Sequence, residues 1–285
     1  MIATELYRGQ GFGNQLWVYA STRCFSIQNE MEYSILGSRR FKGHAFLQLP
    51  FGKLGKLNSA RFPLERYPEG LNHYQKEALI REPNFGFDVS GPDPKFFDLS
   101  SQTLIDGNLQ SLTYIQDFRK EIQDWFHVPG EIFDGCVINF RGGEYKGIRN
   151  VFLPKEYYFN AIELMKKSDP RMKFLVVTDD LAMARTYFPD FPIMSSGGVK
   201  IIMHRVYISP PSSRIGRDFA QLQNAKYLIL SNSSFSWWGA WSSKSARRVI
   251  APKYWAAHNV SDGFWSTGDI AEPSWEWIAR EEYDS

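Results

Sequence analysis

The sequence predicts an α/β protein built on parallel β-sheets. In the second half of the chain, short apolar runs alternate with amphipathic helical stretches. Strands that are apolar along their whole length are typical of parallel sheets covered by helices on both faces. The length of 285 residues is enough for about two domains, each with its own core. A content of 43% hydrophobic and 22% charged residues indicates a globular chain rather than a disordered or fibrous one.

The first half has fewer regular elements than the second. Leu6-Tyr7-Arg8 leads into a glycine turn, and the proline-rich region over 38–100 is expected to be mostly loop. The other elements predicted here are a helix over 15–28, strands over 31–36 and 103–109, and a helix over 113–126. Because Val128-Pro129-Gly130 breaks the last helix, we predict one domain over 1–130 and a second over 131–285.

The second half follows a regular strand–helix order. Its strands are predicted over 135–141, 173–178, 227–232 and 248–252. Its helices are predicted over 154–168, 180–188, 217–225 and 234–241. Pro154 stands at the start of the first of these helices and two lysines at its end, as the rules for helix termini expect.

The charge balance and the cysteines exclude several functional classes. With 33 basic and 31 acidic residues the net charge is +2, which argues against a nucleic-acid or anionic-membrane partner. Cys24 and Cys136 are too few for a disulfide framework or a zinc site and are expected to be buried. We see no signal peptide at the N-terminus and no apolar run of the ~20 residues that a membrane span needs. We therefore expect a cytoplasmic protein without a membrane segment.

Four segments at predicted strand-to-helix junctions are candidates for a binding site. The first, Gly9–Gln15, is a glycine-dense turn that fits either an anion-binding loop or a tight structural turn. The second, Asn139–Tyr145, follows a buried strand, where Arg141 could bind a phosphate or form a surface salt bridge.

The third segment, Thr178-Asp179-Asp180, ends the next strand. Its carboxylates could accept hydrogen bonds from a guanine edge or could cap the following helix. The fourth, Ser231–Trp238, places small hydroxyl residues at a helix start, where an anion is favoured. Trp237 and Trp241 lie one turn apart, and we expect both to pack in the core.

Several motifs are missing from the sequence. It has no Asp-x-Asp pair, no clustered histidines and no G-x-S-x-G nucleophile elbow, so metal-dependent hydrolysis and triad chemistry are unsupported. Arginine, aspartate and serine groups at three strand ends instead suggest a nucleotide lying across a parallel sheet.

Together the four segments resemble the α-1,2-fucosyltransferase family, glycosyltransferase family 11. The matching stretches are the early G-x-G-N-Q loop at 11–15, Asn139–Tyr145 for the family's H-x-R-R-G-D-Y, and Thr178-Asp179-Asp180 for its S-D-D. Asp218-Phe-Ala-Gln-Leu222, one residue longer than the family's D-x-x-L, is followed by N-S-S-F-S-W-W at 232–238. The resemblance implies an α/β fold of the GT-B type, with two facing Rossmann-like domains. The first would be the acceptor-side domain and the second would bind the GDP-sugar, and the C-terminal segment with Trp265, Trp275 and Trp277 is expected to return to the first as a helix.

The implied activity is inverting, metal-independent transfer of L-fucose from GDP-β-L-fucose to a hydroxyl of a galactose-containing glycan, with no cofactor. By position, Arg141 would bind the β-phosphate, and Glu144 is a candidate general base. The other residues implied to bind the donor are Gly13, Asn14, Gln15, Asn139, Asp179, Asp180, Asp218, Asn232, Ser233, Ser234 and Phe235.

Three positions depart from the family pattern. Asn139 stands in place of its histidine, Gly142 in place of its second arginine, and Glu144 in place of its aspartate. The loss of a cation puts donor affinity and the linkage in doubt. An α-1,6-type fucosyltransferase is therefore an alternative. A non-catalytic glycan-binding module that uses the aromatic side chains, which make up 16% of the chain, is the other alternative.

Overall fold

The computed structural model describes residues 1–56, 65–68, 93–99, 102–147, 151–195, 199–202, 205–208, 214–257, 264–266 and 270–279. The chain divides into two compact units, one drawn chiefly from Met1–Trp125 and one chiefly from Phe126 onward. Ile270 and Ala271 are grouped with the first unit. Among the helices of the described ranges, none is long and apolar enough to cross a membrane.

The first unit is built on a four-stranded parallel sheet in the order β2-β1-β4-β3. Its strands are β1 (Ile2–Glu5), β2 (Tyr33–Leu36), β3 (Glu65–Pro68) and β4 (Thr103–Asp106), and its α-helices are α1 (Phe12–Gln28) and α3 (Arg119–Trp125). Four 3₁₀ turns complete the elements described in this unit: η1 (Ser38–Arg40), η3 (Pro94–Phe97), η4 (Leu112–Tyr114) and η5 (Gln116–Phe118).

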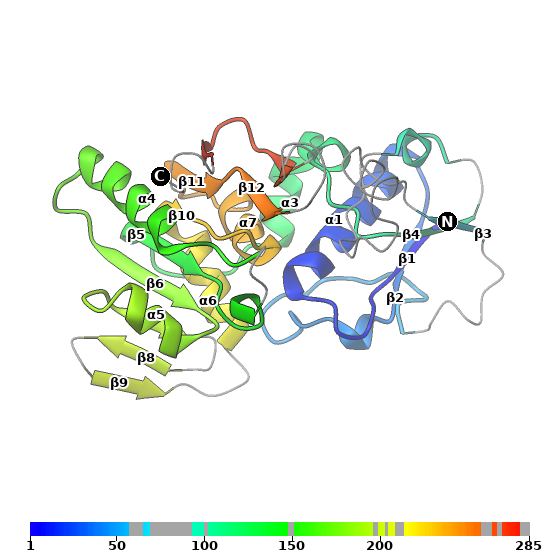
Figure 1. Cartoon of the computed structure of the whole chain (residues 1–285). Helices are drawn as coiled ribbons and strands as arrows, with labels where there is room; N and C mark the ends of the chain where they lie inside the picture. Colours follow the sequence, from blue (N-terminus) through cyan, green and yellow to red (C-terminus); the bar gives the residue numbers. More distant parts are fainter. Residues whose placement is uncertain are drawn as a thin grey trace. The chain divides into compact units, whose positions relative to one another are not determined.

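Helix α1 is the central helix of the first unit (Figure 1). Most of its residues are buried, which is expected of a helix that is apolar on nearly all sides. Phe25 on this helix packs against Phe96 and Tyr114, with ring centres 5.4 and 4.9 Å apart. Part of the aromatic content of the chain therefore forms the core of this unit.

The second unit contains a larger sheet in the order β14-β11-β10-β5-β6-β7-β8-β9. The pairs are parallel from β14 to β7, and β8 and β9 are antiparallel additions. The strands are β5 (Phe133–Phe140), β6 (Phe174–Thr178), β7 (Ile193–Ser195), β8 (Val199–Ile202), β9 (Arg205–Ile208), β10 (Ala225–Ile229), β11 (Arg248–Pro252) and β14 (Glu276–Ile278), with a separate hairpin of β12 (Tyr254–Ala257) and β13 (Phe264–Ser266).

The helices of the second unit connect the parallel strands, as Figure 1 shows. They are α4 (Lys155–Ser168), α5 (Leu181–Tyr187), α6 (Arg214–Gln223) and α7 (Ser234–Trp241), together with the 3₁₀ turn η6 (Tyr145–Gly147). Cys136, Ile138 and Phe140 of β5 point to one face of the sheet and share a buried core with Tyr157 and Ala161 of α4. The predicted α/β class with parallel sheets is confirmed, and both cysteines are buried.

Two predicted elements are wrong. The helix expected over 113–126 is two 3₁₀ turns followed by α3, because Ile115 leaves the helical region at φ −131°. The helix expected near the C-terminus is also wrong. Trp277 lies in β14, where it pairs with Ala251 of β11, and Trp265 lies in β13. Such a strand forms because its backbone pairs with a strand that is distant in the sequence, so the local sequence pattern does not predict it.

Candidate active site

The second sheet changes its direction of growth between β5 and β10. From β5 the chain adds β6 and β7 on one side, and from β10 it adds β11 and β14 on the other. In open α/β sheets, ligands bind at such a point, beyond the carboxyl ends of the strands. Arg141 directly follows β5, and Ser231–Ser233 directly follow β10. Two of the predicted segments therefore flank this point.

Arg141 is held by two carboxylates. Its Nη1 donates a hydrogen bond to Oδ2 of Asp179, and its Nη2 donates to Oε1 of Glu144 at 2.8 Å. The guanidinium carbon lies 4.9 Å from the centre of the Tyr145 ring. Nε is buried and has no acceptor in the described part of the chain. Since the side chain is 31% exposed and a guanidinium has five N–H donors, an incoming anion can reach donors that these contacts leave over.

The two aspartates that end β6 have different partners. Asp179 accepts from the backbone N–H of Gly142 at 2.9 Å as well as from Arg141, so it fixes the position of that arginine. Asp180 accepts from the Met183 N–H at 3.1 Å and caps α5, which confirms the capping interpretation for this residue.

Asp180 also accepts from Nζ of Lys146 at 2.7 Å. This hydrogen bond, together with the backbone N–H groups of α5, holds the pKa of Asp180 below its ordinary value. All four carboxylate oxygens of Asp179 and Asp180 thus have a donor within the chain. Each oxygen keeps a second lone pair, so recognition of guanine by either residue stays a prediction.

The loop after β5 can approach β6 closely because it begins with two glycines. A Cβ atom on Gly142 would lie 2.5 Å from Cβ of Asp180, and one on Gly143 would lie 2.5 Å from Oδ2 of Asp179. Gly143 also has a φ of +31°. A larger residue at 142 would therefore push the loop away from the aspartates. Gly142, which stands where the family pattern has an arginine, is therefore needed for this close contact.

Asn139 and Ser231 connect the ends of three strands. Oγ of Ser231 lies 2.5 Å from Oδ1 of Asn139, whose Nδ2 lies 3.4 Å from the carbonyl oxygen of Val177. The amide of Asn232 donates to the carbonyl oxygens of Val151 and Trp255, both at 2.7 Å. Asn139 and Asn232 are buried, and these contacts use their amides to hold the chain around the site.

Helix α7 begins beside this network. Ser233 is its N-cap residue, and the hydroxyl of Ser236 donates back to the carbonyl oxygen of Ser233 at 3.0 Å. The N–H groups of a first helical turn have no acceptor within the helix and favour an anion beyond its start. Ser234 and Phe235 of this turn are half-buried. Trp237 and Trp241 are stacked with centres 5.4 Å apart and are buried, which confirms their core role.

Asp218 is a buried carboxylate on α6. This helix runs parallel to α7, since Phe219 packs on Phe235 at 5.8 Å and Leu222 packs against Gly239 one turn further along both helices. Asp218 lies one turn before Leu222 and so faces the beginning of α7. It is 1% exposed, its Oδ1 has no partner in the described ranges, and burial raises its pKa to about 7. Such a perturbed carboxyl group is typical of functional sites.

The predicted residues of the first unit lie at the start of α1. Gly13 is in its first turn, and Oδ1 of Asn14 accepts from Nε2 of Gln110 at 3.0 Å. The amide of Gln15 is buried, donates to the carbonyl oxygen of Arg40 at 2.8 Å and accepts from the N–H of Lys42 at 2.9 Å. Gln15 therefore holds the loop after β2 against α1. A donor-binding role for these three residues stays a prediction.

Sequence reasoning missed Lys146 and overlooked the arginine partner of Glu144. Glu144 is 71% exposed and forms its ion pair with Arg141, so the role of general base stays a prediction for it. Lys146 brings a second cation to the same loop, 2.7 Å from Asp180. The signal in the sequence is a basic residue four positions after Gly142, at the end of the glycine turn.

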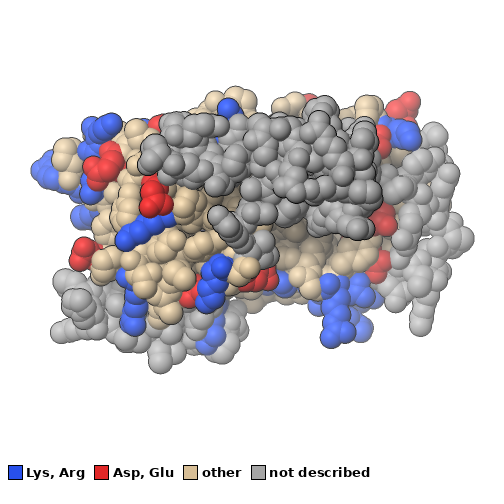
Figure 2. Space-filling model, viewed as in Figure 1, with Lys and Arg blue, Asp and Glu red and all other residues tan. Residues whose placement is uncertain are grey.

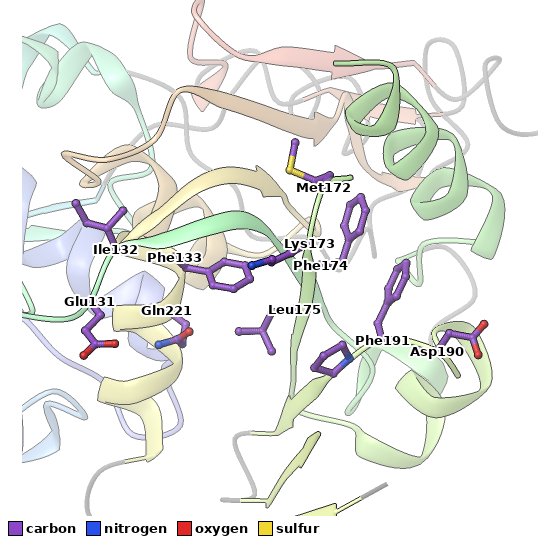
Figure 3. A pocket seen from close by; sticks show the side chains of 11 residues that line it. Glu131, Ile132, Phe133, Met172, Lys173, Phe174, Leu175, Asp190, Phe191 and Gln221 are labelled. Atoms are coloured by element: carbon purple, nitrogen blue, oxygen red, sulfur yellow. The ribbon is translucent and has the colours of Figure 1, made fainter. Parts of the chain in front are cut away.

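A cavity of about 600 Å³ lies at the opposite, amino-terminal edge of the second sheet (Figure 3). Its walls include Phe133 at the start of β5, Phe174 at the start of β6, and Phe191 shortly before β7. Its lining includes Gln221 of α6 but no residue of Gly9–Gln15, Asn139–Tyr145, Thr178–Asp180 or Ser231–Trp238. The cavity is therefore separate from the site at the carboxyl ends of the strands.

Comparison with solved structures finds fucosyltransferases. The fucosyltransferase NodZ from Bradyrhizobium aligns over 87% of this chain and 94% of its own, with 12% identity and a TM-score of 0.48. FUT1 from Arabidopsis thaliana in complex with GDP aligns over 93% of this chain and 73% of its own, with 9% identity and a TM-score of 0.44.

Comparison of sequences finds two glycosyltransferases of Escherichia coli. An α-1,2-colitosyltransferase is 30% identical over 153 residues, 51% of this chain and 48% of the relative. The O-antigen biosynthesis glycosyltransferase WbnK is 25% identical over 124 residues, 43% of this chain and 36% of the relative. The chain thus matches about half of the first relative's length and about a third of the second's.

The model of glycosyl transferase family 11 matches residues 144–279. This range contains the two aspartates after β6, Asp218 on α6 and the whole segment at the start of α7, while Arg141 and the loop at 11–15 lie before it. The resemblance stated from the sequence motifs is thereby confirmed. Residues 144–279 thus form a domain of glycosyl transferase family 11.

Proposed function

We propose that the protein transfers L-fucose from GDP-β-L-fucose to a hydroxyl of a galactoside, with inversion and without a metal, and forms an α-1,2 linkage. The proposal rests on one observation. Arg141 and the start of α7 follow the neighbouring strands β5 and β10, at the point where the sheet changes its direction of growth. A diphosphate bound there would meet a guanidinium from one side and helix N–H groups from the other.

This arrangement suits the charge that the reaction creates. When the bond between the sugar and the diphosphate breaks, negative charge builds up on the departing GDP. Arg141 and the first turn of α7 would stabilise that charge in place of a divalent cation. Arg141 can offer the phosphate the N–H donors that its carboxylate partners leave over. If the guanidinium shifts towards the phosphate, we expect the exposed Glu144 to be released first, because Asp179 is also fixed by the N–H of Gly142.

Colitose is the second candidate for the transferred sugar. The matched relative of 30% identity is named an α-1,2-colitosyltransferase. Its name shares the α-1,2 linkage with our proposal and differs in the sugar. The two candidates therefore require the same site for the diphosphate and differ only at the groups that contact the sugar.

Product analysis tests the proposal. The chain is incubated with lactose and either GDP-β-L-fucose or GDP-activated colitose, and the product is assigned by NMR. We expect an α-linked fucose on O2 of galactose. A faster reaction with colitose would support the second candidate, another linkage would overturn the α-1,2 assignment, and no transfer from either donor to a panel of galactosides would contradict both.

Arg141→Ala serves as the matched test of the site. Removing one transition-state contact of this kind lowers the rate by about 10²–10³-fold. Arg185→Ala, which removes an exposed arginine on α5 of the same unit, is the control and should keep the parent rate. Normal turnover of Arg141→Ala would remove this arginine from the proposed mechanism.

A further inference from the structure

The first sheet has its own point of reversal, between β1 and β4. From β1 the chain continues to β2 on one side, and β3 and β4 lie on the other. The rule that places ligands beyond the carboxyl ends of the strands applies here as well. Tyr7 follows β1 and Asp106 ends β4, and the hydroxyl of Tyr7 donates a hydrogen bond to Oδ1 of Asp106 across this point.

Polar groups suited to sugar hydroxyls gather near the same edge. Asp106 and Asn108 follow each other closely at the end of β4, and Asn14 at the start of α1 is bonded to Gln110. Asp106 and Asn108 are half-buried, so part of each side chain can be reached from solvent. A few polar groups that converge at a strand edge are typical of small-molecule sites.

Within the described ranges of the chain, three exposed cations at this edge have no carboxylate partner. Glu5 of β1 is in register with Leu36 of β2, and Arg8 and Arg39 each follow three residues later. The two arginines therefore both follow the carboxyl ends of neighbouring parallel strands. Lys42 follows on the loop that Gln15 holds against α1. The side chains of these three residues have no ion pair or hydrogen bond with the described parts of the chain.

Two other basic residues of this unit differ from these three because each has a carboxylate partner. Arg40, between Arg39 and Lys42, is already paired with Glu5 at 3.1 Å and bonded to the carbonyl oxygen of Leu6. At the opposite edge of the same sheet, the exposed Lys53 is paired with Glu32 at 3.0 Å. Figure 2 shows basic side chains gathered at the lower edge of the first unit, over the segment of η1 and the loop after β1.

We propose that this edge binds an acceptor glycan that carries an anionic group, with Arg8 and Arg39 contacting a carboxylate or phosphate and the Tyr7–Asp106 side contacting sugar hydroxyls. The proposal rests on the proposed function, because it names the class of acceptor. A neutral galactoside would leave both arginines without a partner, whereas an acid-bearing one would satisfy them with charge-assisted hydrogen bonds.

Binding without any donor tests this proposal. Three probes share one disaccharide frame: lactose, its analogue with glucuronate in place of glucose, and lactose 1-phosphate. We expect at least one anionic probe to bind the full chain about tenfold more tightly than lactose and to lose this advantage in high salt. A preference for one anionic probe identifies the group as carboxylate or phosphate. Equal binding of all three probes, or no binding, overturns the proposal.

Variants that remove one positive charge test whether the anionic probe binds at this edge. Arg8→Gln and Arg39→Gln should each remove most of the preference for the anionic probe and leave lactose binding unchanged. Lys120→Gln, which removes an exposed lysine from α3 of the same unit, is the control. An undiminished preference in both arginine variants would overturn the proposal. Since the assay contains no donor, anion-selective binding would stand even if transfer of fucose failed, so the two proposals fail independently.

Discussion

At the scale of single residues, Asp218 combines burial with an unsatisfied polar atom. Its Oδ1 has no partner in the described ranges, and desolvation outweighs the favourable charge of Arg217, so its pKa rises to about 7. In the unfolded chain an aspartate has a pKa of about 3.9. Between these two values the folded protein holds a proton that the unfolded chain has lost.

The stability of the protein should therefore fall as the pH rises through this window. The free energy of unfolding decreases by about 1.4 kcal/mol per pH unit between about 4 and 7 from this group, and levels off above its folded pKa. Asp218→Asn keeps the shape without the charge. We expect it to unfold at a higher temperature than the parent at pH 8 and at a similar temperature near pH 4, measured by calorimetry.

Gln221→Glu is a control for this measurement, because residue 221 lies on the same helix at a partly exposed position. Its stability should follow the pH dependence of the parent. If Asp218→Asn showed the parent's decline between pH 4 and 7, the raised pKa would not be the cause of that decline.

Some of the motif residues near the site form hydrogen bonds within the protein that indicate a structural role. Asn139, Asn232 and Gln15 belong to the motifs, yet their buried amides are bonded within the protein. Sequence patterns identified them correctly as special positions. Their hydrogen bonds show that they hold the loops around the site, a role that the one-dimensional pattern does not distinguish from ligand binding.

At the scale of elements, the loop between β5 and α4 depends on Gly142. The position is restricted by space, since a Cβ would lie 2.5 Å from Cβ of Asp180. Gly142→Ala should displace the loop and break the hydrogen bond from residue 142 to Asp179, which also positions Arg141. We expect the KM for the nucleotide-sugar to rise about tenfold, and the melting temperature to fall by a few degrees.

Gly147→Ala is the matched control in the same loop. Nothing lies within 4 Å of a Cβ added there, so the variant should keep the KM and the melting temperature of the parent. Steady-state kinetics with varied donor concentration measures both variants. A Gly142→Ala protein with the parent's KM would show that the loop's contact with the aspartates is unnecessary for donor binding.

Element prediction succeeded where local pattern and tertiary role agreed. The helix over 234–241 and the strand over 248–252 are observed with the predicted bounds, because an apolar run and a clear start coincide in each. The helix predicted over 113–126 failed in its first part, where Ile115 leaves the helical region at φ −131° and separates two 3₁₀ turns.

At the scale of the whole molecule, the proposed chemistry uses fixed positive groups in place of a bound cation. The transfer rate should therefore be unchanged by an excess of EDTA, and added Mg²⁺ or Mn²⁺ should not raise it. A radiochemical or NMR transfer assay on protein passed over a chelating resin measures this. Loss of activity in EDTA with recovery on adding a divalent cation would overturn metal independence.

The sequence by itself determined the α/β class, the alternation of the four helices with β5, β6, β10 and β11 in the second half, and the family resemblance through its motifs. These features depend on local periodicity and on short residue patterns. Tertiary structure decided which motif residues meet. Arg141 and Asp179 are 38 positions apart in the chain and become partners because β5 and β6 are adjacent parallel strands. It also decided that β14 is a strand and that Arg8 and Arg39 follow the ends of adjacent strands, since strand pairing joins segments that no local pattern relates.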